Sequence, residues 1–103
     1  MLGFEKEPKF KLVPRDEIYT KYYLRLKVED KVGVLSKITL LMSKAGISVD
    51  SFLQKPKANE AHSTLFFTTH HSFERQIKAL LKELSRQDFV KDKPFMMRIE
   101  KWD

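Results

Sequence analysis

The chain contains no cysteine among its 103 residues. Disulfide bonds, thiolate metal ligands and cysteine nucleophiles are therefore excluded, and the composition fits a reducing compartment such as the cytoplasm. No apolar run approaches the roughly 20 residues that a membrane-spanning helix needs. No signal-peptide pattern opens the sequence either. We therefore expect a cytoplasmic protein without a membrane partner.

Glycine is scarce too, with three residues in the chain. The sequence has no Gly-x-Gly-x-x-Gly turn for a dinucleotide, no phosphate-binding loop and no nucleophile–base signature. The adjacent His70 and His71 lack acidic residues at metal-ligand spacing, and a place at a strand–helix junction explains them better. We therefore predict no catalytic residue, no metal site and no cofactor within this chain.

Long blocks of one charge are absent as well. The formal net charge is +6, which by itself raises the expectation of a nucleic-acid partner. The lysines and arginines are scattered, however, with acids between them and no run of five basic residues. We therefore expect a solvated surface of mixed charge and no nucleic acid.

The hydrophobic content of 42% is enough for the core of one compact domain.

The sequence does contain a strand-to-helix transition at Gly33. Residues 21–29 alternate between apolar and polar, which is typical of a half-buried strand. Residues 34–45 carry an apolar stripe of helical period, and Gly46 follows as a stop signal. A strand that turns through a glycine into a helix exposes the first N–H groups of the helix and the positive end of its dipole. Such a corner favours a carboxylate or phosphate ligand.

The rest of the chain repeats this alternation of patterns. Residues 47–54 and 61–69 are predicted strands, residues 73–84 a second amphipathic helix and residues 95–100 a last strand. The strand at 61–69 is apolar in both phases, which indicates an interior position.

Four polar residues take definite places in this prediction. Ser48 and Gln54 share one face of their strand. Ser72 is the expected N-cap of the second helix, and Glu74 lies on the solvent side of that helix.

The element order is therefore β-α-β-β-α-β, which predicts an α+β, ferredoxin-like fold. This fold has a four-stranded antiparallel sheet with two helices on one face. Right-handed crossovers place the first and third strands in the centre. The second strand becomes an edge strand. Its residues 47–53 contain no proline or lysine that would hinder pairing with a strand of another chain. We expect that edge to be paired or covered.

Residues 22–35, Tyr-Tyr-Leu-Arg-Leu-Lys-Val-Glu-Asp-Lys-Val-Gly-Val-Leu, resemble the opening of an ACT domain, a small regulatory module that binds amino acids. The chain also resembles, more narrowly, the C-terminal regulatory domain of bacterial homoserine dehydrogenases, in residues 22–26, 46–55, 69–70 and 98–100. The resemblance implies that residues 21–103 form an ACT regulatory domain. It also implies that residues 1–20 are the linker or tail of an upstream catalytic domain.

The resemblance implies partners as well. ACT domains commonly pair side by side through the second-strand edge, so a homodimer is expected. Their ligands lie between the first strand–helix corner of one domain and the start of the second strand of its partner. For a homoserine dehydrogenase the expected effector is threonine, the end product, acting on the catalytic domain of the same chain. The parent enzyme is expected to use NAD(P), whereas this chain is expected to hold no cofactor.

The resulting candidate ligand-binding residues are Asp30, Val32, Gly33, Val34, Leu35, Ser48 and Gln54. The N–H groups near Gly33 would bind the ligand carboxylate. Asp30 would accept from the ammonium group or else cap the helix. Many ACT domains have proline where this chain has Val32, and many amino-acid-binding members have asparagine where it has Ser48.

Two other functions remain open from the sequence. One is an ACT domain that only dimerises and binds no ligand. The other is a ferredoxin-like RNA-binding domain, which the basic charge and the aromatic residues Tyr23, Phe52 and Phe66 permit. The third predicted strand argues against RNA binding because it has neither the glycine nor the basic residue of an RNA recognition motif.

Overall fold

The computed structural model describes residues 14–56 and 61–100. The predictions for residues 1–13, 57–60 and 101–103 lie outside these described residues. They cover most of the predicted upstream tail, most of the predicted loop after the second strand and the last three residues of the predicted ACT domain.

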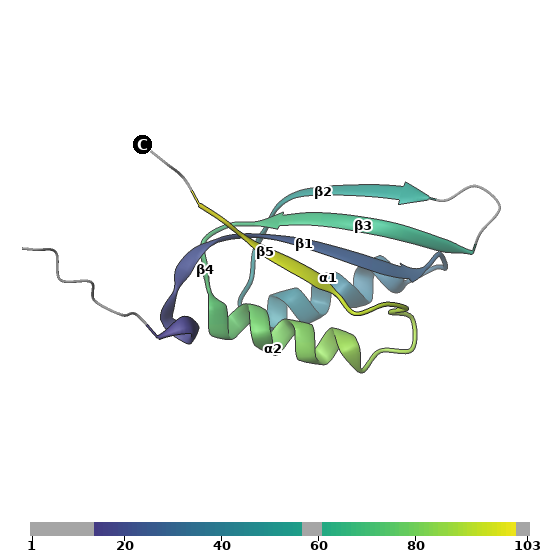
Figure 1. Ribbon diagram of the computed structural model, residues 1–103. Coiled ribbons are helices and arrows are strands. Elements are labelled where there is room, and N and C mark those ends of the chain that lie inside the picture. The colour runs from purple at the N-terminus through teal and green to yellow at the C-terminus, as the bar shows by residue number, and fades with distance from the viewer. Residues whose placement is uncertain (1–13, 57–60, 101–103) are drawn as a thin grey trace, which may run out of the picture.

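The fold is an antiparallel sheet with two helices on one face (Figure 1). After a short 3-10 turn the elements are β1 (Tyr19–Glu29), α1 (Val34–Lys44), β2 (Val49–Pro56), β3 (His62–Thr69), β4 (Ser72–Phe73), α2 (Glu74–Ser85) and β5 (Phe95–Ile99). The sheet order is β2-β3-β1, with β5 on the other side of β1, and the short β4 pairs with the first two residues of β1. The predicted ferredoxin-like architecture is confirmed, with β1 and β3 in the centre and β2 at an edge, and the two-residue β4 is a fifth strand beyond the predicted four.

The core lies between the sheet and the helices. The apolar face predicted for β1 is buried, and each of its four side chains is at most 2% exposed: Tyr22, Leu24, Leu26 and Val28. The helices contribute Val34, Ile38 and Met42 from α1 and Ile77, Leu80 and Leu84 from α2. Every second residue of β1 from Tyr22 to Val28 is buried, and the buried residues of the helices recur with the helical period of 3.6. These faces pack together in one apolar layer. Within the described residues, no helix is long and apolar enough to cross a membrane.

A β-bulge at Asp50 changes the orientation of β2. Val49 is opposite Thr69, but the next paired residue is Ser51, opposite Thr68. Asp50 is therefore an extra residue, which reverses the alternation of side chains beyond it. Gln54 consequently faces the helix side of the sheet, opposite the buried Leu65. The prediction that Ser48 and Gln54 share a face is wrong, because strict alternation does not survive an inserted residue.

The start of α2 also differs from the prediction. Ser72 does not cap the helix, because it belongs to β4 and its hydroxyl donates to the carbonyl of His70 at 3.1 Å. Phe73 is the N-cap residue, and its N–H donates to Oε1 of Gln76 at 2.7 Å. The cap therefore comes from the third residue of the helix reaching back, as in half of a capping box.

Glu74 is the largest departure in burial. The sequence places it on the solvent side of α2, but it is 1% exposed. It lies at the first position of α2, and Tyr22 of β1 and Arg98 of β5 both donate to its carboxylate. The first turn of the helix faces the sheet at this point, so the polar side chain is inside and fully hydrogen-bonded.

Candidate functional site

Gly33 forms the corner between β1 and α1. Its φ of 89° lies in the left-handed region, which glycine adopts without the Cβ clash of other residues. No side chain caps α1, so the predicted capping role of Asp30 is wrong. The N–H of Asp30 donates instead to the carbonyl of Ala61 at 2.7 Å, which ties the corner to the start of β3. The left-handed glycine turns the chain into the helix without a side-chain cap.

The first turn of α1 leaves backbone donors available. The helix ladder begins with the N–H of Lys37, which donates to the carbonyl of Gly33 at 3.0 Å. Within the part of the chain that the structure describes, the N–H groups of Gly33, Leu35 and Ser36 have no hydrogen-bond acceptor. These donors and the helix dipole make the corner favourable for an anionic group.

A pocket of about 350 Å³ opens at this corner. Six of the seven candidate residues line it: Asp30, Val32, Gly33, Val34, Leu35 and Gln54. The remaining lining residues, which the sequence analysis missed, are Val28, Glu29, Lys31, Ser36 and Leu65. Val28, Glu29 and Lys31 are direct neighbours of the corner, so a wider window around Gly33 would have found them. Leu65 reaches the pocket only through the pairing of β3 with β1 and β2.

Gln54 brings the edge strand into the pocket. Its Nε2 donates to the hydroxyl of the buried Ser63 at 3.2 Å, which holds the amide in place. Its Oε1 has no donor among the described residues, so this oxygen is an available acceptor. The bulge at Asp50 is the reason that Gln54 points to the helix side and reaches the corner.

The acidic side of the pocket carries two different carboxylates. Glu29 contacts Lys91 at 2.9 Å and Lys31 at 3.0 Å, and these hydrogen bonds lower the pKa of Glu29 to about 2. Asp30 is exposed and has no cationic partner within ion-pair distance among the described residues. Asp30 is thus the carboxylate that is ready to accept from a ligand.

The pocket therefore combines three kinds of contact in one concave place. Its lining offers backbone N–H donors, a carboxylate and an amide oxygen as acceptors, and apolar surface from Val28, Leu65 and the exposed Val32. A zwitterion with a small side chain matches this arrangement.

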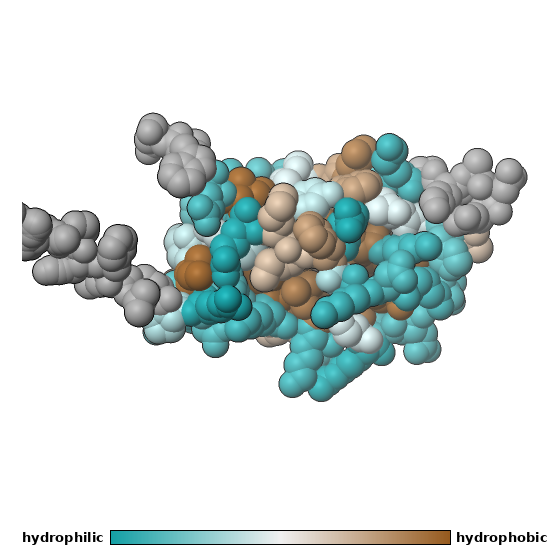
Figure 2. All heavy atoms as spheres, in the orientation of Figure 1, coloured by the Kyte–Doolittle hydropathy of each residue, from teal (hydrophilic) through white to brown (hydrophobic). Residues whose placement is uncertain are grey.

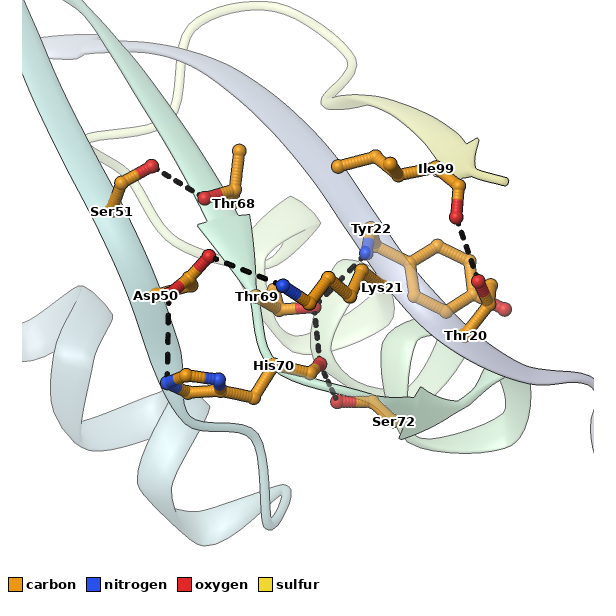
Figure 3. A network of polar contacts seen from close by, with 10 residues as sticks. All are labelled: Thr20, Lys21, Tyr22, Asp50, Ser51, Thr68, Thr69, His70, Ser72 and Ile99. Atoms are coloured by element: carbon orange, nitrogen blue, oxygen red, sulfur yellow. Dashed lines mark hydrogen bonds and ion pairs between the residues drawn. The ribbon is translucent and has the colours of Figure 1, made fainter. Parts of the chain in front are cut away.

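Ser48 does not join these residues within one chain. It is exposed and precedes β2, and its carbonyl accepts from the N–H of His70 at 3.0 Å. The neighbouring Asp50 lies 3.6 Å from Lys21 and 3.7 Å from Nε2 of His70 (Figure 3). This polar cluster lies at the opposite end of β2 from Gln54, because β2 begins opposite Thr69 and ends opposite Ser63.

The aromatic residues considered for RNA binding are divided between two faces. Tyr23 and Phe66 lie on the open face of the sheet, with ring centroids 6.3 Å apart. Phe52 turns to the helix face and packs on Phe67 at 5.1 Å, because it follows the bulge. The three rings therefore do not form one stacking surface.

Comparisons with known proteins point to one family. The sequence model of the ACT domain matches residues 22–89. A homoserine dehydrogenase of Helicobacter pylori is 39% identical over 100 residues, which are 97% of this chain and 24% of that protein. The crystal structure of a homoserine dehydrogenase from Thiobacillus denitrificans has a TM-score of 0.76 at 28% identity, and the match covers 85% of this chain and 19% of that one.

A second solved structure agrees at the level of the fold. The ACT domain from the GTP pyrophosphokinase of Chlorobium tepidum has a TM-score of 0.62 at 18% identity, and the match covers 78% of this chain and all of that one. The chain spans no more than about a quarter of the length of the homoserine dehydrogenases that it matches. The family model covers more than half of the chain and the solved ACT domain has the same fold, so the chain belongs to the ACT domain family.

Proposed function

We propose that this chain is the regulatory domain of a homoserine dehydrogenase and that its corner pocket binds a small amino acid, with threonine as the first candidate. The observation that carries the proposal is the convergence of free N–H donors, Asp30 and the amide of Gln54 on one pocket. The relatives supply the context of an amino-acid biosynthetic enzyme.

The proposed pose follows from the contacts of the pocket. The ligand carboxylate accepts from the N–H groups of Gly33 and Leu35 at the start of α1. The ammonium group donates to Asp30, since Glu29 is already engaged by two lysines. The ligand hydroxyl donates to Oε1 of Gln54, and its methyl group packs on Leu65.

A second copy would complete this pocket. The outer edge of β2 is unpaired within the described chain, and residues 50–55 are exposed. If two β2 strands pair antiparallel about a two-fold axis, the start of one lies beside the end of the other. Ser48 of the second copy then lies near the Gln54 end of β2, where the pocket is. Ser48 would thus act across the dimer rather than within one chain.

Regulation would follow from this position at the interface. A ligand that binds the paired form more tightly than other arrangements shifts the population toward it. The catalytic part of the parent chain would respond through the same coupling free energy. NAD(P) would belong to that part, since the corner here has the single Gly33 and not the series of glycines that lets a dinucleotide pyrophosphate approach. No catalytic step is assigned to this chain.

Isothermal titration tests the proposal. Threonine should bind a preparation shown to be dimeric, more tightly than serine or isoleucine. In the dimer the hydroxyl of Ser48 from the second copy would add a hydrogen bond to the ligand. Gln54→Ala and Ser48→Ala should therefore each weaken binding about tenfold, because each removes one hydrogen bond. Ser43→Ala, at an exposed position of α1, is the matched control and should leave binding unchanged. No heat at millimolar threonine from a dimeric preparation would contradict the proposal and favour a domain that only dimerises.

A further inference from the structure

A second concavity of about 320 Å³ lies beside the corner pocket. Its lining residues are Lys31, Lys37, Arg86, Gln87, Asp88 and Phe89. Three of these are cations, and they come from three segments: the turn after β1, the first part of α1 and the residues that follow α2. The fold thus gathers charges that are distant in the sequence, which the scattered basic residues did not suggest.

The aromatic wall of this concavity gives the site a fixed side. Phe89 is 5% exposed, and the amino group of Lys37 lies 5.9 Å from the centre of its ring. Lys37 has no carboxylate within ion-pair distance in the described part of the chain. It is therefore a cation that is positioned but not neutralised.

The other two cations are exposed and only partly neutralised. Arg86 lies 3.0 Å from Glu83, one turn away on α2, and its side chain is 60% exposed. Lys31 lies 3.0 Å from Glu29, and its side chain is 66% exposed. Asp88 is the single acid among the lining residues. Exposed ion pairs of this kind are weak, so both cations can turn to a ligand of higher charge.

We propose that this concavity binds a phosphoryl anion that carries at least two negative charges. A monovalent carboxylate would gain one weak ion pair, whereas a phosphoryl group offers several oxygens to three cations at once. The guanidinium group of Arg86 can bind two of these oxygens together. The shared chemistry fits inorganic phosphate, pyrophosphate and a nucleoside diphosphate, and the experiment distinguishes among them.

Lys31 connects this site to the corner pocket, because it lines both. An anion that draws Lys31 away from Glu29 leaves a carboxylate oxygen of Glu29 free in the corner pocket. That oxygen can then accept from an ammonium group, so the two ligands would favour each other's binding, and equally in both directions. This coupling rests on the proposed amino-acid function, but the anion site itself does not.

Nuclear magnetic resonance titration of the chain alone tests the anion site without any amino acid. Pyrophosphate should produce saturable shifts at the amides of Lys37 and residues 86–89, with inorganic phosphate weaker and sulfate at equal ionic strength as a reference. A nucleoside diphosphate that binds more tightly than pyrophosphate would identify a nucleotide source. Lys37→Gln and Arg86→Gln should each weaken binding about tenfold, as expected for loss of a charge-assisted hydrogen bond.

The control is Lys82→Gln, which removes one exposed charge of α2 outside the lining residues. Its affinity for pyrophosphate should stay near that of the original chain. Equal losses in Lys82→Gln and Lys37→Gln, or shifts spread over the surface without saturation, would overturn the site. Threonine binding is measured separately, so its failure would leave this result standing.

A double-mutant cycle tests the role of Lys31. Glu29→Gln releases Lys31 and should strengthen pyrophosphate binding about threefold, the size of a surface ion pair. In a Lys31→Gln background the same substitution should have no effect. An equal gain in both backgrounds would show a general effect of charge and would overturn the coupling.

Discussion

The guanidinium group of Arg98 forms two parallel hydrogen bonds with the carboxylate of Glu74, at 2.7 and 2.9 Å. The hydroxyl of Tyr22 donates to the same carboxylate at 2.8 Å. Because Arg98 lies on β5, Glu74 on α2 and Tyr22 on β1, this cluster joins the last strand to the helix layer. The hydrogen bond from Arg98 lowers the pKa of Glu74, and burial of Tyr22 together with the nearby carboxylate raises the pKa of the phenol to about 12.

Arg98→Ala should destabilise the fold strongly. It leaves the carboxylate of Glu74 buried with only Tyr22 as donor, and breaking one side of a buried pair costs about 3 kcal/mol in the free energy of unfolding. Urea unfolding followed by circular dichroism measures this loss. Arg86→Ala breaks the exposed pair with Glu83 and should cost less than about 1 kcal/mol. Similar losses in both variants would contradict the structural role of the buried pair.

Acid should weaken the fold over a defined range of pH. The carboxyl pKa of Glu29 is lowered to about 2 and that of Glu74 is also lowered, so both groups bind protons more readily in the unfolded chain. Their stabilising contribution is present above the unfolded pKa of about 4.3 and is lost as the pH falls toward 2. Lys91→Gln should raise the pKa of Glu29 and make that decline shallower, whereas Lys82→Gln should not. Carboxyl titration by nuclear magnetic resonance gives the midpoints, and an ordinary midpoint for Glu29 would refute the prediction.

Gly33 and Gly46 both have a left-handed backbone conformation, with φ of 89° and 78°, but they should differ in their tolerance of alanine. At Gly33 an added Cβ meets nothing within 4 Å, so Gly33→Ala should cost only the backbone strain of about 1 kcal/mol. At Gly46 the Cβ would lie 2.8 Å from Nε2 of Gln76, which donates to the carbonyls of Ala45 and Gly46. Gly46→Ala should therefore cost about 2 kcal/mol or more, since it adds lost hydrogen bonds to the strain.

Thermal unfolding of both alanine variants measures this difference. In a Gln76→Ala background the cost of Gly46→Ala should fall to that of Gly33→Ala, because the side chain in its way is gone. An unchanged cost in that background would assign the loss to the backbone alone.

Leu53→Lys should weaken the dimer expected through β2. Leu53 lies near the middle of the strand and is 57% exposed on the open face, so the substitution leaves the core untouched. Antiparallel pairing about a two-fold axis places the centres of the two strands together, and the two lysines would then repel each other. The dimer dissociation constant from sedimentation should rise about fivefold, given about 1 kcal/mol for one like-charged cross-strand pair at the axis.

Leu40→Lys is the matched control for this experiment. Leu40 is 54% exposed on α1, away from the β2 edge. It should leave the association unchanged. Equal effects of the two substitutions would argue against pairing through β2.

The open face of the sheet is a second surface through which copies of the chain can associate, because it exposes several large apolar side chains. Phe95, Met97 and Ile99 of β5 are 36% to 51% exposed and lie beside Tyr23 of β1. On the side of the molecule drawn in Figure 2, apolar residues lie near the middle and hydrophilic residues surround them. Variants of Leu53 should therefore be compared at equal protein concentration, so that association through this face is not mistaken for edge pairing.

The sequence by itself determined the layers of this protein. The sequence pattern predicts which faces are buried, through the alternation in residues 22–28 and the helical stripe from Val34 to Met42. A strand has a period of two and a helix a period of 3.6, and each pattern leaves one apolar face. Gly33 marked the corner for an equally local reason, since a left-handed turn favours glycine. Six of the seven candidate residues line the pocket because five of them are neighbours at that corner.

Tertiary structure decided what depends on partners far away in the chain. The bulge at Asp50 exists only in the pairing of β2 with β3. The residue pattern of β2 alone therefore does not predict that Gln54 faces the corner pocket while Ser48 does not. Glu74 looks like a solvent-facing residue until Arg98, 24 positions later, supplies the charge that makes its burial possible. Periodicity is a property of one segment, whereas register and ion pairing are properties of two, and the second kind cannot be read from either segment alone.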